Sequence, residues 1–200
     1  MKNKGVLYAL CAGISWGISL GIFGRTMTSF GFTAMQVSAV RTTISAITFI
    51  ILALVTDRKA FRLNPKDIWI FLCSGFISVT LFCWCYFTST RLCSLAVGGV
   101  LQYTAPVWVV VFSAVIFKEP ITKVKAAAML VAIAGCVLVS GITHGVGQVS
   151  AFGLVAGVFS GITYGSYTIF TRFAVPKYRT MTINVYTFIV ASATSLLLSG

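Results

Sequence analysis

The residue types that perform catalysis are scarce in this sequence, and their spacing brings no two of them together. The three carboxylates (Asp57, Asp67 and Glu119) fall between the apolar segments, and the one histidine, His144, has no acidic residue or cysteine beside it. General acid–base or nucleophilic catalysis needs such groups within hydrogen-bond reach of one another. We therefore expect no catalytic residues and no enzyme activity. No glycine-rich phosphate motif with lysine is present, which argues against ATP as a direct energy source.

The cysteines predict neither a metal site nor a cofactor. All six fall within apolar segments, and Cys83 and Cys85 have neither metal-ligand spacing nor a histidine nearby. Cysteine in such a setting usually behaves as a small buried apolar residue. We expect no metal and no cofactor.

Polar and aromatic residues inside the apolar segments favour ligand binding instead. Ser15 and Trp16 stand beside glycines in the first segment, Thr163 and Tyr164 do so in the sixth, and Tyr167 lies one helical turn further on. A ligand cavity needs mostly apolar walls and a few placed polar groups. We expect Ser15, Trp16, Tyr164 and Tyr167 to bind substrate. Ordinary packing, or an aromatic belt at the membrane interface, is the alternative interpretation.

The fourth apolar segment carries Gln102, Tyr103 and Pro106 close together. An amide is costly against lipid, and a proline leaves a carbonyl one turn earlier without its helical partner. We expect a kink here, with Gln102 and Tyr103 facing a cavity and contacting substrate. A purely structural kink is the alternative.

Arg41 is the one charge well inside an apolar segment. Ionisable residues within a membrane are costly and usually functional. At 1.5 Å per residue, however, Arg41 lies only about 10 Å from the end of its helix and could extend to the interface. If its side chain faces a cavity, we expect it to attract an anionic or carboxylate-bearing solute.

Composition predicts the elements that must position these residues. About 58% of the residues are apolar and 9% are charged, whereas a soluble domain has about 25% charged residues. A helix needs about 20 apolar residues to cross the bilayer. Seven segments qualify, too long and too uniformly apolar for strands, and they predict an all-α integral membrane protein, a polytopic bundle of transmembrane helices in the lipid bilayer. They run over 6–24, 34–55, 68–90, 92–116, 122–141, 150–171 and 182–200.

The basic residues predict the orientation. The formal net charge is +12, but the lysines and arginines alternate by loop and form no patch, so we expect no nucleic-acid partner. Twelve of the 15 lie at the N-terminus and in the second, fourth and sixth loops. Because Lys and Arg are retained on the cytoplasmic side, we expect a cytoplasmic N-terminus, with the loops near 25–33, 91 and 142–149 outside.

An internal repeat is visible at an offset of 148 residues. The segment 13–17 (GISWG) matches 161–165 (GITYG), and Gln36-Val37 matches Asn184-Val185. One unit then contains five helices, an odd number, so the second copy must begin on the opposite side of the membrane. Inverted repeats of this kind underlie alternating access in many secondary transporters. Chance similarity between apolar segments is the alternative.

The repeat also predicts the domain organisation. Residues 5–141 form a first five-helix unit, and 150–200 begin a second, incomplete one. We expect a whole protein of about 296 residues, twice the offset, and no transport by residues 1–200 alone. The oligomeric state has no signal in the sequence.

Small residues recur every fourth position in the first and sixth segments. Such stripes let two membrane helices approach closely, and they would also let two bundles rock against each other. We expect helix packing at Gly13, Gly17, Gly21, Gly157, Gly161 and Gly165.

The chain resembles the EamA family of the drug/metabolite transporter superfamily. The resemblance rests on Ser15-Trp16-Gly17, Val40-Arg41, the segments 101–106 and 135–141, and Phe117-Lys118-Glu119-Pro120. It implies a ten-helix carrier of the inner membrane, often an exporter of amino acids or other small metabolites. The family pattern usually has Glu before the fourth-segment proline, where this chain has Ala105, which argues against a carboxylate role there. A channel or a lipid-handling membrane protein is the alternative function.

Overall fold

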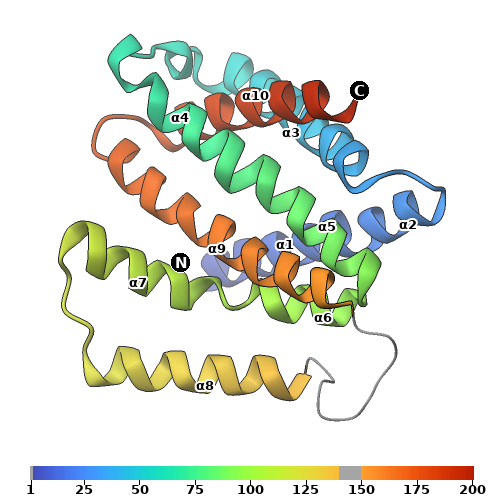
Figure 1. Ribbon diagram of the computed structural model, residues 1–200. Helices are drawn as coiled ribbons and strands as arrows, with labels where there is room; N and C mark the ends of the chain where they lie inside the picture. Colours follow the sequence, from blue (N-terminus) through green and yellow to red (C-terminus); the bar gives the residue numbers. More distant parts are fainter. Residues whose placement is uncertain (1, 140–149) are drawn as a thin grey trace.

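The computed structural model describes residues 2–139 and 150–200, and all their regular structure is helical (Figure 1). Each of the seven predicted segments is a helical rod, so the prediction of an all-α polytopic membrane protein is confirmed. The rods, in order, are α1 (Lys2–Trp16) with η1 (Gly17–Phe23) and α2 (Gly24–Ser29); α3 (Ala34–Thr56); α4 (Ile68–Gly75) with η4 (Phe76–Leu81) and α5 (Phe82–Leu92); α6 (Leu95–Gln102) with α7 (Ala105–Phe117); α8 (Lys123–Val139); α9 (Ala151–Ala174); and α10 (Thr180–Ser199). Two short 3₁₀ turns, η2 (Arg58–Phe61) and η3 (Pro65–Asp67), lie between α3 and α4.

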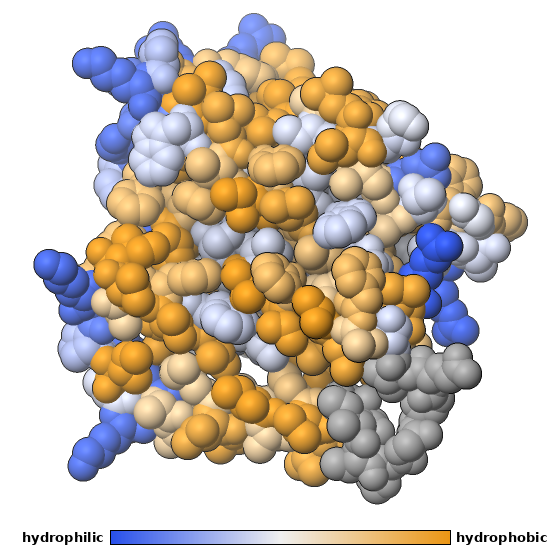
Figure 2. Space-filling view, in the orientation of Figure 1, coloured by the Kyte–Doolittle hydropathy of each residue, from blue (hydrophilic) through white to orange (hydrophobic). Residues whose placement is uncertain are grey.

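Five of the rods are long and apolar enough to cross a membrane, and α8 and α9 are not among them. The described part of α8 has 17 residues, and α9 has 24 residues with many Ser, Thr, Tyr and Gly. Because α9 packs against α4, α5, α6 and α7, several of its polar side chains, such as Ser160 and Thr163, are buried against protein. Figure 2 shows an apolar surface between two hydrophilic edges on the face in view, as a membrane protein requires.

Side chains at the ends of the rods cap their backbones. Thr33 and Gln36 form a reciprocal capping box at the start of α3, with hydrogen bonds of 3.0 and 3.3 Å. Ser150 accepts a hydrogen bond from the backbone N–H of Gly153 at the start of α9. Lys118 adopts a left-handed conformation, with φ 55°, directly after α7. These residues fix where the apolar helices begin and end.

Hydroxyl groups join the helices in the interior of the bundle. Ser38 and Ser195 share a hydrogen bond of 3.2 Å, and Thr43 and Ser192 share one of 2.8 Å. From the first pair to the second, the residue number rises on α3 and falls on α10, so these two helices pack antiparallel. Hydroxyl pairs between membrane helices contribute about 0.6 kcal/mol each, so specificity rather than strength is their main effect.

The fourth rod is broken between α6 and α7, at Tyr103 and Thr104. Pro106 lies in the first turn of α7, where its missing N–H leaves no helical hydrogen bond unmade. The kink predicted from this proline is therefore present.

The glycines of α9 pack closely against this broken rod. A Cβ on Gly157 would collide with Leu101, and one on Gly161 would collide with the Thr104 hydroxyl and lie 3.1 Å from the Leu101 carbonyl oxygen. A Cβ on Gly165 would lie 3.1 Å from the Ala105 carbonyl oxygen. Only glycine allows α9 to approach the backbone of α6 and α7 this closely.

The matching glycines of the first rod have a different environment. A Cβ on Gly13, Gly17 or Gly21 would meet no atom within 4 Å among the described residues. The close packing expected of this stripe is therefore not found in the described part of the chain, because no helix there lies over it.

Ion pairs bring three basic loops together at one face of the bundle. Each carboxylate of the sequence pairs with a different cation of the 172–179 segment, which places the α3–α4, α7–α8 and α9–α10 loops on the same side. The pairs are Asp57–Arg179 at 2.9 Å, Asp67–Lys177 at 2.6 Å and Glu119–Arg172 at 2.6 Å. The predicted outer loop 142–149, with His144, lies outside the described residues.

Candidate functional site

Two π-helical segments interrupt the first and third rods at the same depth of the bundle as a cavity. Trp16 directly precedes η1, and Ser78 and Val79 lie within η4. π-Helical turns are rare and frequently mark functional sites, because the extra residue per turn shifts the side chains that follow it. Here Trp16, directly before η1, and Ser78 and Val79, within η4, line the cavity.

Three aromatic rings from three rods meet beside these segments. The ring centroids of Trp16 and Tyr164 are 5.6 Å apart, and those of Phe82 and Tyr164 are 5.2 Å apart. Phe82 stacks with Trp16 at 6.5 Å and is almost fully buried. Offset and tilted aromatic pairs of this kind are worth about 0.5–1.5 kcal/mol each beyond their burial. The cluster ties the first, third and sixth rods together.

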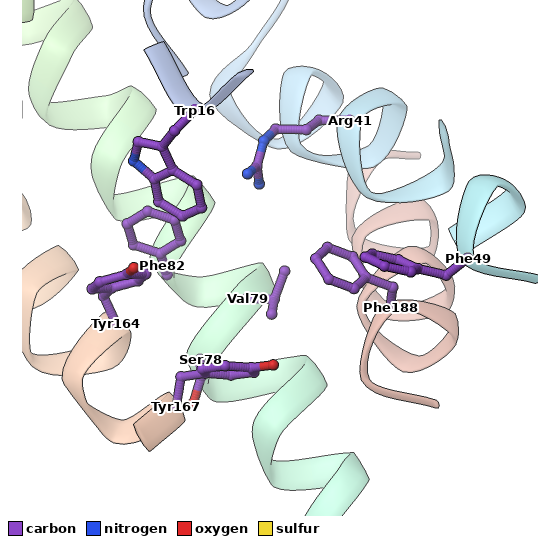
Figure 3. A pocket seen from close by; sticks show the side chains of 9 residues that line it. All are labelled: Trp16, Arg41, Phe49, Ser78, Val79, Phe82, Tyr164, Tyr167 and Phe188. Atoms are coloured by element: carbon purple, nitrogen blue, oxygen red, sulfur yellow. The ribbon is translucent and has the colours of Figure 1, made fainter. Parts of the chain in front are cut away.

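A cavity of 270 Å³ opens next to this cluster (Figure 3). This volume lies just below the range of about 300–1,000 Å³ that is usual for small-ligand sites. Aromatic rings form most of its wall, and Arg41 and Ser78 supply polar groups. Its lining residues are Trp16, Arg41, Phe49, Ser78, Val79, Phe82, Tyr164, Tyr167 and Phe188.

Arg41 reaches into this cavity from α3 (Figure 3). Its Nε donates a hydrogen bond of 2.9 Å to the Ser19 hydroxyl, and its Nη1 donates one of 3.1 Å to the sulfur of Cys83. Its guanidinium carbon lies 5.7 Å from the centroid of the Trp16 ring. With only 9% of the residue exposed, these contacts hold the guanidinium inside the bundle, away from the helix end.

A second cavity of 440 Å³ lies on the other side of the same rings. Gln102, Tyr103 and Pro106 contribute to it at the break of the fourth rod, together with the glycines of the first rod. Trp16 and Tyr164 line both cavities, so their two rings stand between them.

The structure therefore brings six of the seven predicted substrate-binding residues to these two cavities. Ser15 is exposed and lines neither, because neighbouring residues of a helix point in different directions and Trp16 already faces the cavity. Of the predicted residues, Trp16, Arg41, Tyr164 and Tyr167 line the first cavity, and Trp16, Gln102, Tyr103 and Tyr164 line the second.

Sequence reasoning missed the lining residues of the third and seventh rods and one of α3. Phe49, Val79, Phe82 and Phe188 are apolar residues within apolar helices, so nothing in their type or spacing marks them. Ser78 was a possible signal, since a hydroxyl in an apolar run needs a partner, and it shares a hydrogen bond of 2.7 Å with Ser166.

The two rings that separate the cavities occupy equivalent positions in the predicted repeat. Trp16 and Tyr164 are 148 residues apart, and the hydrogen-bonded pair Thr43 and Ser192 is 149 apart. Among the described residues, no group of three or more His, Cys, Asp or Glu side chains could hold a metal ion.

Several helices long and apolar enough to cross a membrane, packed around a cavity with aromatic and polar walls, define a multi-pass membrane protein. The family model described as the EamA-like transporter family matches residues 3–141. The chain belongs to this family, within the drug/metabolite transporter superfamily, which confirms the resemblance seen in its motifs. No curated protein and no solved structure matches the chain.

Proposed function

We propose that the protein is a secondary transporter that exports small metabolites, such as amino acids or related solutes, across the cytoplasmic membrane by alternating access. One observation carries the proposal. Two aromatic residues at equivalent positions of the predicted repeat, Trp16 and Tyr164, touch each other between two cavities of solute size. A solute site at the interface of two inverted repeats is the arrangement that alternating access requires.

The contact between equivalent residues supports an inverted repeat. A residue can touch its own twofold counterpart only where both lie close to the twofold axis. Trp16 meets Tyr164 in this way, and Thr43 bonds Ser192 within one residue of the same offset. The antiparallel packing of α3 and α10 has the relative direction that an axis in the membrane plane produces. Residues 5–141 are then a first unit, and 150–200 begin a second.

The paired rings also offer a mechanism for changing access. Trp16 and Tyr164 are the two residues that line both cavities. Their rings therefore separate a solute in the first cavity from the second cavity. A small rotation of one rod against the other would part the rings and connect the cavities. The unit formed by α9 with α6 and α7 is closely packed, so the first rod is the wall that moves in this proposal.

The basic loops support a cytoplasmic N-terminus and a cytoplasmic 56–67 loop. Three of the four basic regions are the loops that the ion pairs hold at one face. In a background without the six native cysteines, a membrane-impermeant thiol reagent should label a cysteine at Ser29 from outside whole cells and miss one at Asn64. Both positions are exposed at the protein surface. The reverse labelling would invert the proposed topology.

Counterflow of solute tests the transport function. The full-length protein is reconstituted into liposomes preloaded with unlabelled metabolite and supplied with labelled metabolite outside, across a panel of amino acids and related solutes. A carrier gives saturable uptake that the internal solute accelerates, and Trp16→Ala should strongly reduce it. Trp69→Ala is the matched control, because Trp69 packs on Phe173 and lines neither cavity. Flux that does not saturate and shows no counterflow would identify a channel and contradict the proposal.

A further inference from the structure

The guanidinium of Arg41 is a buried cation whose partners in the described part of the chain are neutral. Its hydrogen bonds go to Ser19 and Cys83, and its ring contact is to Trp16. A guanidinium has five N–H donors in a planar fork. The two bonds use one donor on Nε and one on Nη1, so three N–H groups, one on Nη1 and two on Nη2, remain for an acceptor.

No acidic side chain of this sequence is available to accept hydrogen bonds from the remaining N–H groups of Arg41. The sequence has three acidic residues, and each is engaged with another cation at the loop face: Asp57 with Arg179, Asp67 with Lys177, and Glu119 with Arg172. These carboxylates lie in or beside the connecting loops, whereas Arg41 is in the interior of α3. A buried charge normally has a partner, because an unpaired one is costly in a medium of low polarity.

The rest of the cavity is suited to an apolar body. Away from the guanidinium the wall consists of the rings of Phe49, Phe188, Phe82 and Tyr164 with Val79 between them, and Tyr167 and Ser78 close the far end (Figure 3). The cavity is thus amphipathic, with one fixed cation at one side and aromatic faces around it. At 270 Å³ it has room for a single small solute.

We propose that Arg41 binds the carboxylate of a small monocarboxylate whose aromatic or apolar body packs against these rings. This substrate class rests on the proposed transport function and narrows it. Arg is the residue best matched to a carboxylate, since its planar fork forms two parallel charge-assisted hydrogen bonds. The donors for this contact are the remaining N–H groups, one on Nη1 and two on Nη2, and a parallel pair takes one from each nitrogen.

Three probes of nearly equal shape but different charge separate the effect of charge on binding from the effect of shape. Phenylacetate, phenylacetamide and phenethylamine carry the same ring with an anionic, a neutral and a cationic head. Labelled phenylacetate is bound to the purified protein in nanodiscs, with empty nanodiscs as the measure of partition into lipid, and the other two compete. We expect phenylacetate to bind about tenfold or more tightly than the amide, as one charge-assisted hydrogen bond predicts, and the amine to bind most weakly.

Variants of two arginines assign the preference to one position. Arg41→Gln should remove the difference between acid and amide, and Arg41→Lys should retain part of it, because a lysine keeps the charge and loses the fork. Arg25→Gln is the matched control, since Arg25 is exposed at the end of the first rod and lines neither aromatic cavity. It should bind all three probes as the unmodified protein does.

Equal binding of acid and amide by the unmodified protein would overturn the proposal, even if Arg41→Gln fails to fold. So would an acid preference that survives in Arg41→Gln, or no binding of phenylacetate at millimolar concentration. None of these results would contradict the proposed transport function, provided that at least one solute shows counterflow. Binding of phenylacetate through Arg41 without counterflow of any solute would support the carboxylate site and contradict the proposed transport function.

Discussion

The first rod and α9 carry the same stripe of glycines but have different neighbours. On α9, Gly157 and Gly161 meet side-chain and backbone atoms of the broken fourth rod at distances that only glycine allows. On the first rod, Gly13 and Gly17 meet no atom within 4 Å among the described residues. A small-residue stripe therefore makes close packing possible, and a neighbouring helix decides whether it occurs.

The two helices also differ in how their ends are held. Arg172, in the last turn of α9, pairs with Glu119 at 2.6 Å and lies over the ring of Phe117 at 4.0 Å. The first rod contacts the bundle from Trp16 onward, through Trp16, Leu20 and Gly24, and its stripe before Trp16 has no close neighbour among the described residues. We infer that α9 is the fixed wall of the cavity and the first rod the wall with more freedom.

The largest expected difference comes from one bulky residue placed on each stripe. Gly161→Leu must displace the Thr104 hydroxyl and the Leu101 carbonyl, so we expect it to destabilise the protein by about 3 kcal/mol or more. Gly13→Leu meets open space, and we expect a change within about 0.5 kcal/mol. Unfolding in detergent, followed by circular dichroism, measures both.

An equally damaging Gly13→Leu would break this comparison. It would mean that the stripe of the first rod also lies against a close neighbour in the membrane. Gly5→Leu serves as a control on the same helix, since a Cβ there also meets no atom within 4 Å.

A smaller effect is expected at the exposed end of α9. The hydrogen bond from Arg172 lowers the pKa of the Glu119 carboxyl below its ordinary value. The ion pair therefore contributes stability that is present above the ordinary glutamate pKa of 4.5 and is lost as the pH falls through the lower folded pKa. Glu119→Gln should lower the Tm at pH 7 by roughly 2–4 °C at most, because exposed pairs are screened.

The same variant checks the sign of the pH dependence. The Tm difference between the unmodified protein and Glu119→Gln should stay constant from pH 7 to pH 5 and shrink below about pH 4. A difference that grew on acidification would contradict the assigned ion pair.

Much of the fold was predictable from the sequence because the bilayer dictates it. Length and apolar composition gave the seven rods, and Pro106 gave the break between α6 and α7. The π-helical turns η1 and η4 were not predictable, since they depend on how neighbouring rods pack and leave no periodic pattern. The absence of close neighbours at the glycine stripe of the first rod, among the described residues, was not predictable either, because the sequence of one helix does not reveal what packs against it.

The candidate site was predictable only where a residue is unusual in its segment. Arg41 and Gln102 are polar within apolar runs, and Trp16 and Tyr164 stand at matching places in the repeat. Phe82 and Phe188 line the first cavity as well, but they resemble any other apolar residue of a membrane helix. Their role follows from the packing of rods distant in the sequence, which single-residue reasoning does not reach.

The most direct test of the central claim, that Trp16 and Tyr164 from two different rods form one solute site, is a double-mutant cycle on counterflow. Trp16→Ala, Tyr164→Ala and the double variant are compared with the unmodified protein at equal amounts in liposomes, and each kcat/KM is converted to a free-energy change. The centroids of the two rings are 5.6 Å apart, and both rings line both cavities. The account therefore predicts a coupling free energy of about 0.5–3 kcal/mol, with the double variant little worse than either single one. Effects that add to within about 0.3–0.5 kcal/mol, or a single variant that transports normally, would contradict it.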